Sequence, residues 1–191
     1  MPSFPSLARD ILEFWFGPLP HANRAEWFRK DPAFDAMIRE RFGDALESAL
    51  AGSSSGWRAD PRTSLAHVVL LDQFTRNAFR DTPGAFAGDR EALLTATTVV
   101  DAGLDRELDI FERWFLYMPF QHAEALPMQE RSVALFTELA RESGDPGLLE
   151  WAEKHELIIR RFGRFPHRNA ILGRPSTPAE IEFLRQPGSK F

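Results

Sequence analysis

The stretch Thr63–Phe79, TSLAHVVLLDQFTRNAF, decides the fold class. Its first half is apolar on every side, through Leu65, Ala66, Val68, Val69, Leu70 and Leu71, and the sequence turns polar abruptly at Asp72. A surface helix shows a single apolar stripe, whereas a helix that is apolar all round belongs inside a core. The sequence therefore predicts a central helix over 63–79 that is surrounded by other helices.

Amphipathic helices are predicted on both sides of this stretch. Apolar residues recur at helical spacing, and no segment alternates with the period of two that a half-buried strand shows. We expect an all-α fold of about eight helices in a single domain over residues 1–191. The expected helices are 7–16, 32–50, 63–79, 89–100, 105–126 (with a kink or break at Pro119), 127–139, 146–162 and 179–185.

The composition narrows the possible functions. The chain of 191 residues has no cysteine, which excludes disulfides, cysteine-ligated metals and thiol nucleophiles. Its net charge of −5 argues against nucleic acid as a partner. No apolar run approaches the roughly 20 residues that a membrane span needs. We therefore expect a soluble cytoplasmic protein with neither nucleic acid nor a membrane as partner, and the sequence does not predict its oligomeric state.

Polar side chains follow the apolar half of the central helix at a spacing of four. Asp72 and Arg76 would share one helix face, as would Gln73 and Asn77. They could form an ion pair and an amide pair at the helix end. They could also border a cleft, because they come directly after a buried helix.

Two histidines lie on apolar helical stripes. His122 follows Trp114 and Met118, and His155 follows Trp151. Such a histidine is often a hydrogen-bonded core residue, but it could also act as a general base. Glu124 could assist His122 only if the helix breaks at Pro119, because residues two apart on a helix point in different directions.

Metal and cofactor motifs are missing from the sequence. His122, His155, His167 and Asp72 are types of residue that bind zinc or manganese. Their spacing matches no metal motif, however, and no glycine-rich phosphate loop or nucleophile elbow occurs. We therefore expect no metal site and no cofactor.

The stretch Arg160–Asn169, RRFGRFPHRN, carries the densest positive charge. Gly163 should end a helix, and Pro166 should hold the chain before it in an extended conformation. The planar guanidinium of arginine suits carboxylates and phosphates. The segment could be a solvated basic face or a site for an anion. The candidate ligand-binding residues here are Arg161, Arg164, His167, Arg168 and Asn169.

Three motifs together resemble a known family. They are Leu71-Asp72-Gln73-Phe74-x-Arg76-Asn77, Glu130–Phe136 and Arg161–Arg174, and they resemble the bacterial family called domain of unknown function 924. The resemblance covers nearly the whole chain and implies a fold similar to tetratricopeptide-repeat proteins, with helix hairpins stacked around a groove. It implies no activity.

The chain departs from the family pattern in two places. Thr75 stands where the family usually has proline, and Gln121-His122-Ala123 stands where Glu-His-Ser is expected. If the family site uses that glutamate, this chain lacks one negative charge there. Because the motifs are far apart in the sequence, we expect them to meet in space.

Three functional hypotheses follow, in order of preference. The first is a binding module that holds a small anionic molecule or an acidic peptide end through Arg76, Arg161, Arg164 and Arg168. The second is that the arginines only tie the C-terminal segment to the helices. The third is a hydrolase-like enzyme in which His122 or His155 acts as base with Glu124 or Asp72.

Overall fold

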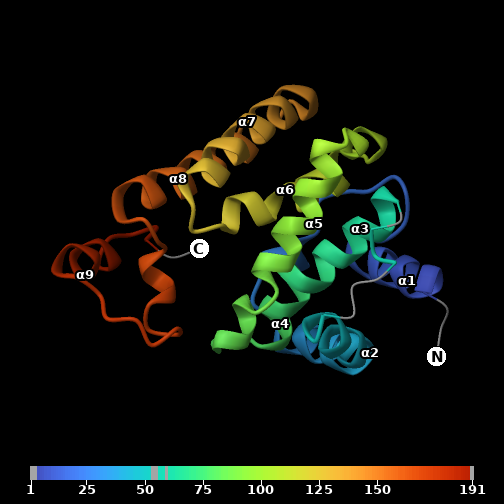
Figure 1. Cartoon of the computed structure of the whole chain (residues 1–191), viewed down its shortest axis with the longest axis horizontal. Helices are drawn as coiled ribbons and strands as arrows, with labels where there is room; N and C mark the ends of the chain where they lie inside the picture. Colours follow the sequence, from blue (N-terminus) through green and yellow to red (C-terminus); the bar gives the residue numbers. More distant parts are fainter. Residues whose placement is uncertain (1–3, 53–55, 59, 190–191) are drawn as a thin grey trace. The chain divides into compact units, whose positions relative to one another are not determined.

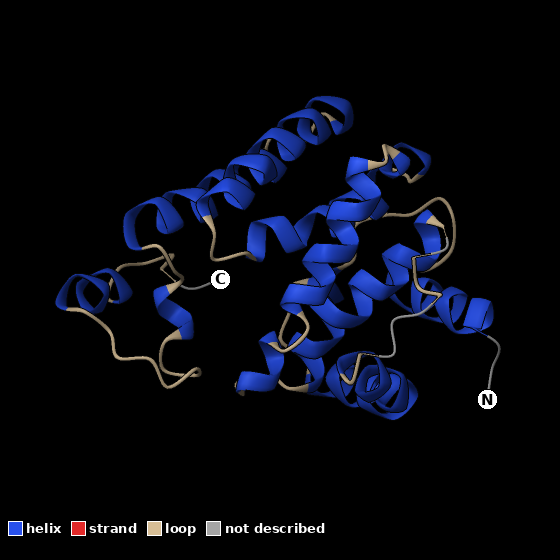
Figure 2. Ribbon diagram, in the orientation of Figure 1, coloured by secondary structure: helices blue, strands red, loops and turns tan. Residues whose placement is uncertain are grey.

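The computed structural model describes residues 4–52, 56–58 and 60–189, and these residues form helices, turns and loops without a strand (Figures 1 and 2). The all-α prediction is confirmed. The described helices number eight when α3, the π-helical turn after it and α4 are taken as one continuous helix. None of them has the length and apolar character that crossing a membrane requires.

The chain forms two compact units. The first contains residues 1–80 and 84–119, and the second contains residues 81–83 and 120–191. Each unit is described by itself below. The prediction of one domain over the whole chain stays a prediction.

The first unit is built around the continuous helix. It comprises α3 (Pro61–Val68), a π-helical turn (Val69–Phe74) and α4 (Thr75–Ala78), as Figure 1 shows. The other helices are α1 (Phe4–Phe16), α2 (Pro32–Leu50), α5 (Asp89–Asp101) and the greater part of α6 (Ile110–His122). Short 3₁₀ turns lie at Ala25–Trp27, Pro83–Phe86 and Leu104–Glu107.

The predicted burial of the central helix is confirmed. Leu65, Leu70 and Leu71 are 0% exposed, and so is Phe74 at the end of the π-helical turn. Large rings complete this core; the indole of Trp15 packs edge-on against Phe74 and Phe115, with centroid distances of 5.7 Å and 5.3 Å. Such ring pairs add to the stabilisation that burial of apolar area provides.

Gly88 allows the chain before α5 to approach the π-helical turn closely. A Cβ atom at this position would lie 2.3 Å from the carbonyl oxygen of Leu71. The neighbour is backbone, so it could not move aside without disturbing the central helix. Glycine at 88 is therefore a packing requirement.

The second unit contains a helix hairpin and the C-terminal segment. Helices α7 (Leu126–Ser143) and α8 (Gly147–Phe162) are joined by a short turn and pack against each other (Figure 1). A 3₁₀ turn (Pro166–Arg168) and α9 (Pro178–Leu184) follow. Ile158, Ile159 and Phe165 form an apolar core in this unit, with Leu126, Phe162 and Phe183 packed against it.

Helix termini follow the capping rules. Asp31 accepts hydrogen bonds from two backbone N–H groups at the start of α2, and Thr177 forms a capping box with Glu180. Gly163 ends α8 in the left-handed region with φ 71°. The predicted start at residue 32 and the predicted stop at Gly163 are confirmed, and the last helix starts at Pro178, one residue before its predicted start.

Of the two expectations for Pro119, the break is wrong, and the kink stays a prediction. Helix α6 starts at Ile110, later than predicted, and runs through Pro119 to His122. Just beyond the proline, the side-chain amide of Gln129 donates to the carbonyl oxygens of Phe120, Gln121 and Ala123 at 3.3, 2.7 and 2.7 Å. These bonds satisfy carbonyl groups that a helix end otherwise leaves unpaired.

Replacing Gly88 by alanine should destabilise the fold. Because the new methyl group would collide with the Leu71 carbonyl, we expect a loss of about 1–3 kcal/mol in the free energy of unfolding, measured by urea denaturation. Gly43, inside α2, is the control because a methyl group added there would have no atom within 4 Å. Gly43→Ala should stabilise by roughly 0.5–1 kcal/mol. Equal effects of the two substitutions would contradict the packing argument.

Candidate functional site

At the polar end of the central helix, Arg76 is held between two carboxylates. Its Nη1 lies 3.2 Å from Asp72 Oδ1, and its two Nη atoms donate to Asp89 at 2.8 and 3.1 Å. Burial disfavours the charged form of Arg76, but these two acids outweigh burial and raise its pKa above the ordinary value. The guanidinium of Arg76 is therefore engaged within the first unit.

The amide pair predicted between Gln73 and Asn77 does not form. Gln73 Nε2 donates to Asp72 Oδ2 at 2.5 Å and contacts Met118 Sδ, whereas Asn77 Nδ2 donates to Asp35 Oδ1 at 2.8 Å. Each amide instead binds a carboxylate: Gln73 binds Asp72, its neighbour in sequence, and Asn77 binds Asp35 of α2. No sequence pattern pointed to Asp35, which binds Arg80 as well as Asn77.

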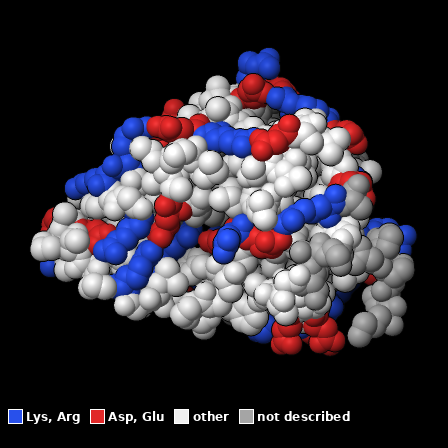
Figure 3. Space-filling model, viewed as in Figure 1, with Lys and Arg blue, Asp and Glu red and all other residues white. Residues whose placement is uncertain are grey.

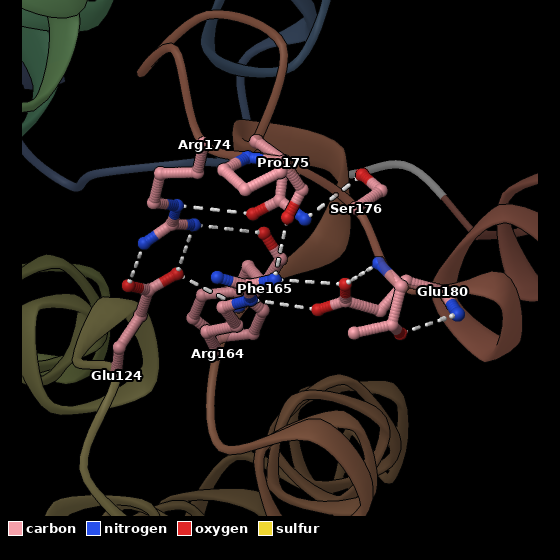
Figure 4. Close-up of polar contacts among 9 residues, drawn as sticks. Glu124, Arg164, Phe165, Arg174, Pro175, Ser176 and Glu180 are labelled. Atoms are coloured by element: carbon pink, nitrogen blue, oxygen red, sulfur yellow. Dashed lines mark hydrogen bonds and ion pairs between the residues drawn. The ribbon is translucent and has the colours of Figure 1, made fainter.

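In the second unit, one glutamate fastens the C-terminal segment. Glu124 accepts hydrogen bonds from Arg174 Nη1 and Nη2 at 2.6 and 2.9 Å, and from the backbone N–H of Phe165 at 2.7 Å (Figure 4). Arg174 also donates to Asn169 Oδ1 at 3.0 Å, and Asn169 donates to Ser176 Oγ at 3.1 Å. We call Glu124, Phe165, Asn169, Arg174 and Ser176 the Glu124 bracket.

The pKa of Glu124 reflects this environment. Partial burial alone would raise it, but the hydrogen bonds from Arg174 and from the Phe165 N–H lower it below the ordinary value of 4.5. Glu124 is therefore ionised at neutral pH, and both of its oxygens already accept hydrogen bonds.

Arg164 forms a second ion pair that holds this segment, with Glu180 near the start of α9. Its Nε and Nη2 donate to the two oxygens of Glu180 at 2.7 and 2.8 Å, and Nη2 also donates to the carbonyl of Pro175 (Figure 4). The hydrogen bond from Arg164, together with those from Thr177, lowers the pKa of Glu180 to about 2 against the opposing effect of burial. The guanidinium of Arg164 is thus already hydrogen-bonded to the carboxylate of Glu180.

The histidines of the second unit gather around Phe165. The rings of His122 and His155 are 6.3 Å apart, His155 packs edge-on against Phe165 at 5.5 Å, and the ring of His167 lies 5.6 Å from that of Phe165, all measured between centroids. The guanidinium of Arg168 lies 4.6 Å from the centre of the Phe165 ring. The ring of Phe165 therefore contacts the rings of His155 and His167 as well as the guanidinium of Arg168.

His155 is neutral at physiological pH. Its side chain is buried and its Nδ1 lies 2.7 Å from the carbonyl oxygen of Trp151, which places the ring proton on Nδ1. Burial first, and then the charges of His122, Arg168 and His167, lower its pKa to about 3. Glu124 uses both of its oxygens to bind Arg174 and the Phe165 N–H.

A surface groove of about 540 Å³ opens at the end of α8. It is lined by Arg161, Phe162, Arg164, Thr177, Ala179 and Glu180. The exposed guanidinium of Arg161 lies over the rings of Phe162 and Phe183, at 4.7 and 5.9 Å from their centres. In the part of the chain that the structure describes, Arg161 has no ion-pair partner.

Other cations of this segment are paired. Arg160 contacts Glu156 and Glu130, Arg164 contacts Glu180, and Arg174 contacts Glu124. Basic and acidic side chains are likewise interspersed on the face shown in Figure 3. Arg161 therefore differs from its neighbours in sequence by its exposed and unpaired guanidinium.

The predicted site residues fall into two sets. Asp72, Gln73, Arg76 and Asn77 belong to the first unit, and the second set, His122, Glu124, His155, Arg161, Arg164, His167, Arg168 and Asn169, belongs to the second. The expectation that the two sets meet stays a prediction. Within the second unit, sequence reasoning missed the roles of Arg174 and Glu180. The sequence does mark both residues, because Arg174 is the last residue of the long arginine motif and Glu180 belongs to the capping box of the last helix.

The Arg164–Glu180 pair should control stability in acid. Because the pKa of Glu180 lies near 2 in the folded chain and near 4.5 otherwise, its contribution is complete above pH 4.5 and is lost as the pH falls toward 2. Glu180→Gln should lower the melting temperature at neutral pH and flatten its pH dependence in this window. Circular dichroism melts at several pH values measure both effects.

Arg185 provides the matched control. It directly follows α9 and pairs with Glu182 of that helix at 3.0 Å, but both side chains are largely exposed. Exposed pairs of this kind contribute little to stability. We expect Arg164→Gln to lower the melting temperature clearly and Arg185→Gln to leave it almost unchanged. Equal effects would show that the Glu180 contact is no stronger than an ordinary surface pair.

Comparison with known proteins gives the family. The family model described as bacterial protein of unknown function (DUF924) matches residues 11–188. A solved structure, the protein of unknown function ATU0120 from Agrobacterium tumefaciens, is similar with a TM-score of 0.86 and 40% sequence identity; the match covers 95% of this chain and 98% of that one. No curated protein matches the chain. The chain therefore belongs to the DUF924 family of bacterial proteins of unknown function.

Proposed function

We propose that the protein is a binding module whose groove at the end of α8 holds the carboxylate of a small anionic ligand or of an acidic peptide end. The observation that carries this proposal is Arg161. Its guanidinium is exposed in the groove and lacks an acidic partner among the described residues, whereas the neighbouring Arg160 and Arg164 are paired.

The surroundings of Arg161 suit a carboxylate attached to an apolar group. Stacking on Phe162 and Phe183 fixes the plane of the guanidinium and leaves its edge for two parallel hydrogen bonds. The two rings lie 5.1 Å apart and offer an apolar surface beside the charge. A peptide C-terminus with an apolar last residue, or an aromatic carboxylate, combines both features.

Much of the remaining arginine cluster supports the structural hypothesis instead. Arg164 is committed to Glu180, and Arg174 and Asn169 belong to the Glu124 bracket. Arg76 is engaged by Asp72 and Asp89. We therefore narrow the ligand role to Arg161 and assign Arg164 to shaping the groove.

The hydrolase-like hypothesis has weaker support. A neutral His155 could accept a proton, and His122 lies beside it. Glu124, however, was expected to orient the base and instead binds Arg174 and Phe165. We do not propose catalysis on these contacts.

Replacing Arg161 tests the binding proposal. The probes are benzoate, N-acetyl-phenylalanine and inorganic phosphate, and binding is followed by ¹H–¹⁵N NMR shifts of residues lining the groove and by calorimetry. We expect the aromatic carboxylates to bind and Arg161→Gln to weaken them by about tenfold or more, as the loss of a charge-assisted pair implies. Arg161→Lys should restore binding only in part, because an ammonium group cannot donate in parallel.

Arg160→Gln is the control with the same change in net charge. Arg160 is adjacent in sequence and half-exposed, but Glu156 and Glu130 already engage it. Its replacement should leave the affinity within about twofold. If Arg160→Gln weakens binding as much as Arg161→Gln, or if no probe shifts the groove signals, the proposal is wrong.

A further inference from the structure

A second cluster of polar side chains lies in the first unit, away from the groove. His21 comes from the loop after α1, and Asp109 and Glu112 lie at the start of α6. His21 Nδ1 is 2.6 Å from Asp109 Oδ2, and one ligand atom from each of the three residues lies within 4.8 Å of the others. None of these residues belongs to the arginine or histidine sets discussed above.

The cap at the start of α6 uses one oxygen of Asp109 and one oxygen of Glu112. Glu112 N–H donates to Asp109 Oδ1 at 3.0 Å, and Asp109 N–H donates to Glu112 Oε2 at 3.1 Å. This is a reciprocal capping arrangement. The cap leaves one oxygen of each carboxylate for other contacts: Asp109 Oδ2 lies 2.6 Å from His21 Nδ1, and Glu112 Oε1 lies 2.9 Å from Arg62 Nη1.

Burial makes the arrangement unusual. The side chains of His21 and Glu112 are 5% and 2% exposed, whereas Asp109 is 39% exposed and gives access from solvent. Glu112 Oε1 is buried and accepts no hydrogen bond from the described residues. Its compensation is the charge of Arg62, whose Nη1 lies 2.9 Å away on a side chain that is 57% exposed. The buried carboxylate of Glu112 is thus balanced by the guanidinium of Arg62, whose side chain is largely exposed to solvent.

We propose that His21, Asp109 and Glu112 form a binding site for a divalent transition-metal ion of the Zn²⁺ or Mn²⁺ class. One imidazole nitrogen and two carboxylate oxygens are donors that these ions accept, and solvent next to Asp109 supplies the remaining ligands. The ion takes the place of Arg62 as the charge that balances Glu112. The positive end of α6 opposes a cation, but the two capping carboxylates outweigh it because they carry two full negative charges.

Spacing in the sequence does not reveal this site. Metal motifs are recognised by regular spacing on one element, and none occurs in this sequence. By residue type alone, the candidates were His122, His155, His167 and Asp72. His21 and Asp109 are 88 positions apart. The site depends instead on the packing of the loop after α1 against α6.

Calorimetric titration of the intact protein with ZnCl₂ and with MnCl₂ at neutral pH tests the proposal. We expect one ion per chain for at least one of the metals. His21→Gln and Glu112→Gln should each weaken metal binding by more than about tenfold. Replacing a residue that only orients a metal ligand already costs about that much, and these two residues are ligands themselves. Arg62→Gln should tighten binding, because it removes the cation that competes for Glu112.

His122→Gln controls for binding at other imidazoles and should leave the affinity unchanged. Because a variant could lose structure, each is checked by circular dichroism, and the wild type is followed independently by NMR. Mn²⁺ should broaden the His21 ring signals first. No binding by the wild type, binding that is lost in His122→Gln but kept in His21→Gln, or weaker binding by a folded Arg62→Gln variant would each overturn the proposal.

Discussion

The C-terminal segment depends on the carboxylate of Glu124. This one group accepts the fork of Arg174 and the backbone N–H of Phe165, so it fixes two points of the chain after α8. Arg174 in turn donates a hydrogen bond to Asn169, and Asn169 donates one to Ser176. A charge-assisted network of this kind is stronger than isolated surface pairs, because each partner is oriented by another.

This constraint explains why a row of arginines has different roles. Gly163 turns the chain at the end of α8, and Glu124 holds the next residues in place. Arg164 then meets Glu180 of the last helix, while Arg161 stays on the final turn of α8 with its guanidinium above two phenylalanine rings. Arg164 and Glu180 thus line the groove as a pair, and Arg161 is exposed in the same groove. A structural role and a binding role are compatible, because different members of the cluster perform them.

The sequence predicted the fold where local rules decide the outcome. Apolar coverage identified the central helix, and Gly163 identified the end of α8. The helix α6 continues through Pro119 and ends at His122, where Gln129 of the next helix binds the last carbonyl groups, a contact that no local pattern predicts. Gln73 and Asn77 likewise bind the carboxylates of Asp72 and Asp35 rather than each other, and no local pattern pointed to Asp35.

The site was less predictable, because its pairs join distant parts of the chain. Spacing identified arginines and histidines as candidates, but it could not tell which acid each arginine meets: Glu124 and Arg174 are 50 positions apart, and Arg164 and Glu180 are 16 apart. An arginine paired with an internal acid and an arginine open to a ligand look alike in sequence. Only the three-dimensional pairing separates Arg161 from its neighbours.

Hydrogen exchange at the Phe165 amide tests this account most directly. That N–H donates to Glu124, so its protection reports whether the bracket holds the segment. In Glu124→Ala and Arg174→Gln we expect faster exchange at Phe165 and in the residues leading to α9, while the α7–α8 hairpin keeps its protection. Unchanged protection at Phe165 in both variants would contradict the claim that Glu124 organises the C-terminal segment.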